Sequence, residues 1–264
     1  MRGIGTFLGR SGTQGVALTF FSLVVLVPMA ALVSRAFAGG PSAFWHAATT
    51  LESLDALQLT LLCAAVGAGL NALVGTATAW VLVRDQFLGK TILNSLIDLP
   101  FALPTVVAGV TFYSLYGPES PAHLTLTGTW VGITVAILFV TLPFTVRSVQ
   151  PVLETMTFNA EAAAATLGAS SFRVLRTITL PTLAPAILTG TGLAFARAMG
   201  EYGSVVFISN NLPYHSEVAS SYVYSLASSA QPAAAASVAV LMMVIALVVL
   251  VGVHVVSRRM AKGL

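Results

Sequence analysis

The chain has 264 residues, of which 56% are apolar and only 8% are charged, and its mean hydropathy is +0.90. A soluble globular domain carries about 25% charged residues, so this composition excludes one and predicts an all-α polytopic membrane protein with a single domain, residues 1–264. The net charge of only +3 gives no reason to expect a nucleic-acid partner, although the pI is near 9.3.

Six apolar segments are long enough to cross a bilayer, which takes about 20 helical residues. They lie at about 16–38, 57–83, 92–116, 130–149, 183–207 and 233–256. The stretches between them, residues 39–53, 117–129 and 208–231, are predicted as loops, and residues 1–15 as a polar start. The first segment could also be a cleaved signal peptide, but it exceeds the usual apolar core of about 7–15 residues, so we favour a retained span.

The third segment carries one carboxylate and two prolines. Pro100 and Pro104 each lack a backbone donor and disturb the preceding helical turn. At membrane depth the freed groups need protein or a water-filled cavity, so Pro100–Thr105 is predicted to break the helix and to line or gate a path. For Asp98, a path role and a place near the cytoplasmic interface stay equally open.

The fifth segment contains a charged pair. A buried arginine such as Arg197 costs about 2.5–3.5 kcal/mol, so it is paired or lines an aqueous path. Glu201 follows four residues later and is expected on the same helix face, with Ser204 close behind. A self-neutralising pair that holds helices together and a contribution to the substrate path are both compatible with this spacing.

Residues 151–182 are the longest central stretch that is too polar for lipid. Glu161 falls in the first turn of a short helix, and Gly168 is placed to end that helix in a left-handed conformation. Ser170 can cap a second short helix, which Pro181 is expected to terminate. The predicted L shape with exposed apolar side chains suits a groove on a partner protein.

Positively charged residues favour the cytoplasmic side of a membrane protein. With a cytoplasmic N-terminus, six spans place ten basic residues on that side and only Arg35 on the other. The ten are Arg2, Arg10, Arg84, Lys90, Arg147, Arg173, Arg176, Arg258, Arg259 and Lys262. Both termini and the 151–182 loop are therefore predicted in the cytoplasm.

The same loop resembles the EAA loop of ABC-importer permeases, which docks on the ATP-hydrolysing subunit. The residues that carry the resemblance are Glu161, Ala162, Ala163, Gly168, Ile178, Leu180 and Pro181. The spacing from Glu161 to Gly168 is one residue longer than is usual in that family, so either Glu161 or Ala162 corresponds to the family's glutamate. We call residues 151–182 the coupling loop.

Three runs, at 98–109, 149–154 and 197–210, resemble sulfate/thiosulfate permeases of the T type, and molybdate permeases share parts of them. The resemblance implies a type I importer permease in a bacterial cytoplasmic membrane. Its implied partners are two ATPase subunits, a W-type second permease and an extracytoplasmic sulfate-binding protein. Import of molybdate or tungstate is the alternative.

The chain contains no phosphate loop of the form G-x-x-x-x-G-K-[ST], so ATP hydrolysis is expected on a separate chain. Neither a cofactor nor a metal is expected, since the only cysteine is Cys63 and the four histidines lack ligand spacing.

Two other classes of membrane protein, a secondary transporter and an enzyme, fit the sequence less well. A stand-alone secondary transporter with Asp98, Arg197 and Glu201 as a proton relay usually shows matched broken helices, and only one conspicuously broken segment is visible. A membrane enzyme would need a nucleophile–base set, which is not apparent.

Overall fold

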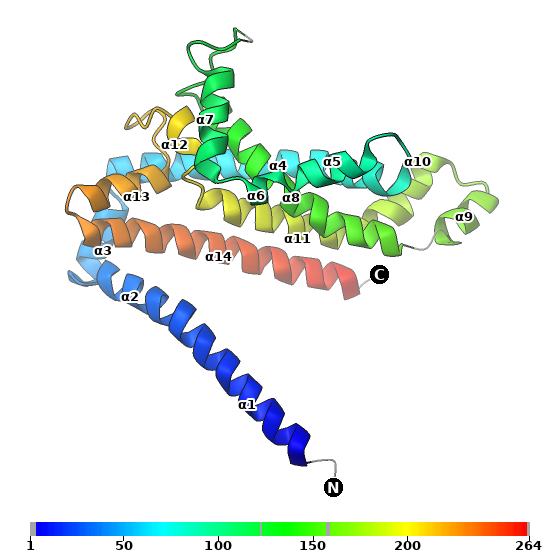
Figure 1. Cartoon of the computed structure of the whole chain (residues 1–264), viewed down its shortest axis with the longest axis horizontal. Coiled ribbons are helices and arrows are strands. Elements are labelled where there is room, and N and C mark those ends of the chain that lie inside the picture. Colours follow the sequence, from blue (N-terminus) through cyan, green and yellow to red (C-terminus); the bar gives the residue numbers. More distant parts are fainter. Residues whose placement is uncertain (1–3, 122, 157–158, 263–264) are drawn as a thin grey trace. The chain divides into compact units, whose positions relative to one another are not determined.

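A computed structural model describes residues 4–121, 123–156 and 159–262, and the described residues contain helices and no strand. The chain forms two compact units (Figure 1). The first comprises Met1–Thr50 with Val223–Leu241, and the second comprises Leu51–Tyr222 with Met242–Leu264. Residues 157 and 158 of the coupling loop lie outside the described residues.

The first unit contains α1 (Ile4–Phe21), a π-helical turn (Ser22–Leu26), α2 (Val27–Ala36) and α3 (Gly40–Ala48). The stretch 39–53 was predicted as a loop, and α3 shows that most of it is helical. Pro41 sits in the first turn of α3, where its fixed φ favours a helix and its missing N–H is not needed. The Ser237 hydroxyl donates a hydrogen bond to the Ala36 carbonyl oxygen at 3.1 Å.

The second unit is built on three long helices that run side by side: α4 (Leu51–Arg84), α8 (Trp130–Thr155) and α11 (Leu180–Met199) (Figure 1). Small residues permit the close approach, since a Cβ added at Gly75 would lie 2.8 Å from the Thr145 Cβ. Asn71 bridges α4 and α8 by donating to the Leu138 carbonyl at 3.0 Å and to the Thr141 hydroxyl at 2.8 Å. Its side chain is thus used in packing.

The third apolar segment is broken as predicted. It consists of α5 (Lys90–Ile97), α6 (Leu99–Ala102) and α7 (Thr105–Tyr116). Leu103 is extended, with φ −84° and ψ 136°, because the ring of Pro104 disfavours a helical conformation in the residue before it.

The fifth segment was predicted as one helix over 183–207, and this was wrong at both ends. Upstream, α10 (Ser171–Val174) continues through a π-helical turn (Leu175–Thr179) directly into α11. Downstream, α11 ends at Met199, and after an irregular stretch α12 (Val205–Ile208) follows. The described residues therefore contain a second broken segment besides the one that was predicted. The predicted loop at 208–231 also contains a helix, α13 (Ala219–Ser228).

Five helices among the described residues are long and apolar enough to cross a membrane. They are Thr13–Ala36, Leu51–Arg84, Trp130–Thr155, Ser171–Met199 and Pro232–Ala261, the last within α14 (Pro232–Lys262). A sixth crossing would have to use the broken third segment, whose longest apolar helix is Thr105–Tyr116. The count of six spans stays a prediction.

Candidate functional site

The bend in the coupling loop forms as its local sequence dictates. It joins α9 (Asn159–Thr166) to α10 through Gly168, which has a φ of +81°. The Gly168 N–H donates to the Ala165 carbonyl at 3.0 Å and the Ala169 N–H to the Ala164 carbonyl at 3.0 Å, the paired bonds of a Schellman cap. The Ser170 hydroxyl then accepts from the Arg173 N–H and caps α10.

Pro181 does not terminate the second helix, so this prediction was wrong. It occupies the first turn of α11, directly after the π-helical turn Leu175–Thr179. In a regular helix the proline ring would clash with the carbonyl four residues earlier, and the wider turn displaces that carbonyl. The coupling loop is thereby joined rigidly to α11.

Glu161 holds the bend against the C-terminal end of α4. Its two carboxylate oxygens accept from Arg84 Nη2 at 3.0 Å and Nη1 at 3.1 Å, and from the Thr179 hydroxyl at 2.8 Å. The two charged side chains are only 17% and 11% exposed, and the Arg84 guanidinium lies 5.1 Å from the centre of the Trp80 ring. Glu161, and not Ala162, therefore forms the ion pair, because alanine has no polar group in its side chain.

The outer surface of the bend is apolar. Leu167 is 89% and Phe172 71% exposed, and Ala162, Ala163 and Leu180 are exposed as well. Ile178 and Pro181 are half-buried. A cavity of about 540 Å³ lies on the concave side, with Trp80, Glu161, Phe172 and Thr179 among its lining residues. Of the predicted coupling residues, Ala162, Ala163 and Leu180 are thus exposed, and Glu161 lines the cavity.

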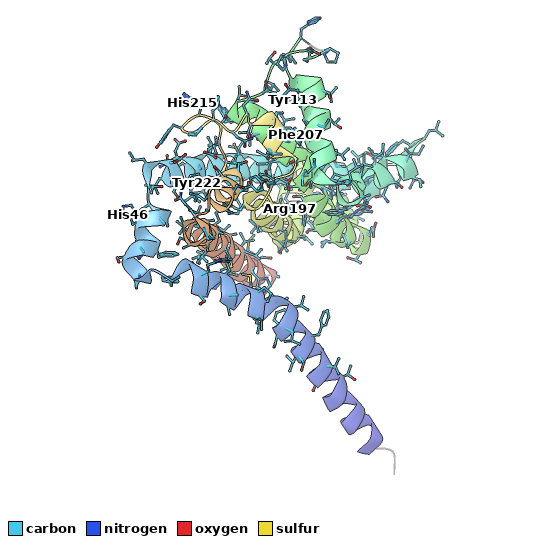
Figure 2. The ribbon with its side chains drawn as sticks, turned by 60° about the vertical axis from the view of Figure 1, so that its left-hand side comes forward. His46, Tyr113, Arg197, Phe207, His215 and Tyr222 are labelled. Atoms are coloured by element: carbon cyan, nitrogen blue, oxygen red, sulfur yellow. The ribbon has the colours of Figure 1, made fainter. Side chains whose placement is uncertain are left out.

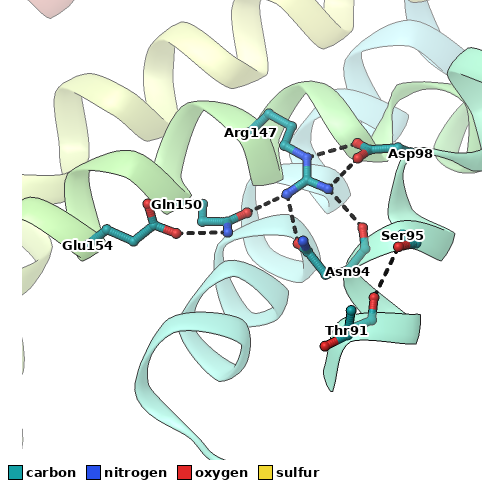
Figure 3. Close-up of polar contacts among 7 residues, drawn as sticks. All are labelled: Thr91, Asn94, Ser95, Asp98, Arg147, Gln150 and Glu154. Carbon is teal, nitrogen blue, oxygen red and sulfur yellow. Dashed lines mark hydrogen bonds and ion pairs between the residues drawn. The ribbon is translucent and has the colours of Figure 1, made fainter. Parts of the chain in front are cut away.

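Asp98 does not join the other path candidates but meets Arg147 of α8 (Figure 3). Arg147 donates to the Asp98 carboxylate from Nε at 2.8 Å and from Nη2 at 2.6 Å. Its other bonds reach the Asn94 side chain and carbonyl and the Gln150 side chain, at 2.6–2.8 Å. All five N–H groups of the guanidinium are therefore occupied. We call this group of contacts the Arg147 clamp.

The two broken segments meet each other. A Cβ at Gly109 of α7 would lie 2.7 Å from the Gly203 carbonyl oxygen, and one at Gly203 would collide with the Thr105 hydroxyl. Figure 2 shows the neighbouring side chains Tyr113 of α7 and Phe207 of α12. Thr105 and the stretch before Ser204 are thus brought together, next to the break that Pro100 and Pro104 create.

Arg197 and Glu201 pair, but not as two residues within one helix. Arg197 Nη1 lies 2.7 Å from Glu201 Oε2, and Glu201 comes after the end of α11. The Glu201 side chain is 1% exposed and also accepts from the Ser204 N–H at 2.9 Å. The Arg197 side chain keeps 36% of its surface exposed. The buried carboxylate organises the irregular backbone, and the guanidinium remains accessible.

Residues 71–262 match the family model described as binding-protein-dependent transport system inner membrane component. The chain belongs to this family. Over 261 residues, this permease is 36% identical to the sulfate transport system permease protein CysT of Salmonella typhimurium, covering 96% of the chain and 94% of that relative. It is 38% identical over 216 residues to the CysT of Synechocystis, covering 79% and 76%.

Solved structures agree on the fold. The permease aligns with a chain of a bacterial alginate ABC transporter with a TM-score of 0.79 at 16% identity, over 98% and 97% of the two chains. A chain of the MetNI methionine ABC transporter gives a TM-score of 0.60 at 14% identity, over 78% and 95%. The predicted all-α importer-permease fold and the predicted family are therefore confirmed, and the secondary-transporter and enzyme alternatives are set aside.

Sequence reasoning missed Arg84, Thr179 and Arg147 as site residues. Arg84 and Arg147 had entered only as signals of membrane orientation. Their partners lie 77 and 49 residues away in the chain, so no local spacing pointed to them. The unpaired Asp98 in an apolar segment was the one available signal.

Proposed function

We propose that this permease is the membrane subunit of an ATP-driven importer for sulfate and thiosulfate. The observation that carries the proposal is its 36% identity to a sulfate transport system permease along nearly the whole of both chains. Molybdate or tungstate import is the alternative substrate class.

ATP is hydrolysed on separate chains in this proposal. Two ATPase subunits dock on the coupling loop of this permease and of a related W-type permease, and a sulfate-binding protein delivers the anion from outside. The exposed Leu167 and Phe172 supply the apolar contact that such docking needs, and the charged Glu161 and Arg84 fix the shape of the loop behind it.

Movement of the ATPase subunits reaches the path through two arginines. Arg84 joins the coupling loop to α4, and the Arg147 clamp joins α8, which leads into the loop, to the α5–α6 part of the broken segment. A shift of α8 therefore pulls on Pro100–Pro104 and on the contact of Thr105 with Gly203. We place the gate at this contact between the two breaks.

The path itself is wet. Complete dehydration of a dianion in a low-dielectric passage is prohibitively costly, so the anion keeps water and makes few direct charge contacts. Arg197 suits this role because Glu201 neutralises it in part while its guanidinium stays accessible.

The orientation puts both termini and the coupling loop in the cytoplasm. In a Cys63→Ala background, an impermeant thiol reagent added to intact cells is expected to label Glu119→Cys and His215→Cys, but not Ser170→Cys. All three positions are exposed, whereas Ser120 and Ser216 in the same two outer loops are buried and unsuitable. Labelling of Ser170→Cys from outside would overturn the orientation.

The substrate is tested by deleting the gene in a strain with no second sulfate system. Uptake of labelled sulfate and thiosulfate should stop, growth should depend on cysteine, and molybdate-dependent enzymes should stay active. Surviving sulfate uptake together with failed molybdate uptake would replace the sulfate reading with the molybdate one.

A further inference from the structure

A narrow apolar groove lies between α11 and α14 in the second unit. It has a volume of about 300 Å³ and is lined by Thr189 and Leu193 of α11 and by Leu250, Val251, Val253 and His254 of α14. This volume is at the lower end of the range of about 300–1,000 Å³ for small-ligand sites. The groove belongs neither to the coupling loop nor to the two breaks.

The walls of the groove are fixed by close contacts. A Cβ at Gly192 would lie 2.8 Å from Val253 Cγ1, so the two helices touch there. At the end nearer the C-terminus, the Ser257 hydroxyl donates to the Pro185 carbonyl at 2.9 Å and lies 3.1 Å from the Thr189 hydroxyl. These bonds hold α14 against α11 at that end of the groove.

One end of the groove is cationic. His254 is exposed, and Arg258 follows it by four residues, which places Leu250, His254 and Arg258 in one row along α14. Arg259 is turned about 100° away from that row. Within the described residues, Arg258 and Arg259 are exposed and take part in none of the ion pairs. An aliphatic slot that opens beside an uncompensated cation matches a molecule with an apolar tail and a negative head.

We propose that this groove binds one anionic phospholipid, with an acyl chain against Leu193 and Val251 and the phosphate on Arg258 and His254. A volume of about 300 Å³ suits a single acyl chain, whereas a membrane-spanning helix about 10 Å across occupies far more space than that. Basic residues at the cytoplasmic end of a membrane helix attract anionic headgroups. The proposal rests on the family's place in the membrane and not on the transported anion.

Such a lipid has a mechanical consequence. Thr189 and Leu193 lie on α11, which continues without a break from the coupling loop. A bound phospholipid fills the space beside this helix and resists its movement toward α14. Anionic lipid is therefore expected to change the ATP hydrolysis of the assembled transporter, independently of the anion that is carried.

The test uses the assembled transporter in bilayers of equal parts phosphatidylglycerol and phosphatidylcholine, extracted gently and weighed by native mass spectrometry. Wild type is expected to retain one phosphatidylglycerol. Arg258→Gln should weaken retention about fivefold, and Val251→Trp, which fills the groove, should abolish it. The matched controls are Arg259→Gln and Val248→Trp, an exposed residue of α14 that does not line the groove, and both should retain the lipid.

Three results would overturn the proposal. They are no retained lipid in wild type, equal retention of phosphatidylcholine, and equal loss in Arg258→Gln and Arg259→Gln. If Val251→Trp does not assemble, the comparison of the two arginines decides alone, because both side chains are on the surface. Sulfate uptake, measured in parallel, reports on the proposed function separately.

Discussion

Removing the charge of Glu161 should weaken docking of the ATPase subunit without preventing insertion of the permease. Glu161→Gln keeps the shape of the side chain but takes the carboxylate away from Arg84 and Thr179. Breaking a fully buried ion pair costs about 3–5 kcal/mol, and a surface pair is worth at most about 1 kcal/mol. At 17% and 11% exposure this pair lies between the two, so we expect about 2 kcal/mol.

This free energy acts on the population of correctly shaped coupling loops. The docking form is the coupling loop whose bend is held against α4. When the stability of this form falls by about 2 kcal/mol, the apparent Kd for the ATPase subunit rises by up to about thirtyfold. The affinity is measured by titrating labelled ATPase subunit onto detergent-purified permease. Glu154→Gln is the matched control, because Glu154 is exposed and accepts a hydrogen bond from the Gln150 side chain, and it should change Kd by less than about twofold.

A double-mutant cycle with Arg84→Gln makes the reasoning refutable. The two single variants should each weaken docking, and the double variant should be little worse than either one. A coupling energy below about 0.5 kcal/mol, or unchanged docking in Glu161→Gln, would show that the pair does not shape the docking surface.

Three further changes test the remaining parts of the machinery. Gly168→Leu should uncouple ATP hydrolysis from transport, because a leucine at φ +81° costs about 1–2 kcal/mol and adds bulk to the docking surface. Gly168→Asn should be tolerated better, and equal activity of the two variants would contradict this reasoning. Arg147→Met should leave ATP hydrolysis intact but lower the amount of sulfate carried per ATP. Arg147→Lys should restore that amount only in part, since lysine cannot reproduce the five-donor clamp. An unchanged amount of sulfate per ATP in Arg147→Met would exclude transmission through the clamp. Glu201→Gln should impair assembly more than Arg197→Met combined with Glu201→Gln, because the single change leaves a cation without its carboxylate. A double variant that assembles but is inactive would assign Arg197 to the path. Unaffected assembly and activity in both variants would deny the pair either role.

Local features of the coupling loop could be predicted from the sequence because each depends on its own neighbours. The left-handed Gly168 and the cap at Ser170 need only a few adjacent backbone groups, and both are present as predicted. The break near Pro104 has the same origin, in the steric demands of one ring on the preceding residue.

Long-range features could not be predicted in this way. Whether Arg84 meets Glu161 depends on how α4 packs against the coupling loop, which no spacing in the sequence encodes. The second break was missed because an apolar run resumes at Val205–Phe207 and hides the end of α11, although Gly200 and Gly203 were a signal for it. Pro181 was misjudged because a wide turn can accommodate a proline that a regular helix would exclude.

The continuous run from Ser171 to Met199 makes the docking surface and Arg197 two ends of a single lever. Its 29 residues extend over about 40 Å, so a tilt of about 10° at the docking end displaces the far end by about 7 Å. The π-helical turn Leu175–Thr179 lies near the docking end of this lever, and the hydroxyl of Thr179 in that turn donates a hydrogen bond to Glu161. A π-turn accommodates one residue more than a regular turn, so deleting one residue here would leave a regular helix with the docking surface facing nearly the same way, whereas a deletion elsewhere in the lever would rotate that surface by about 100°.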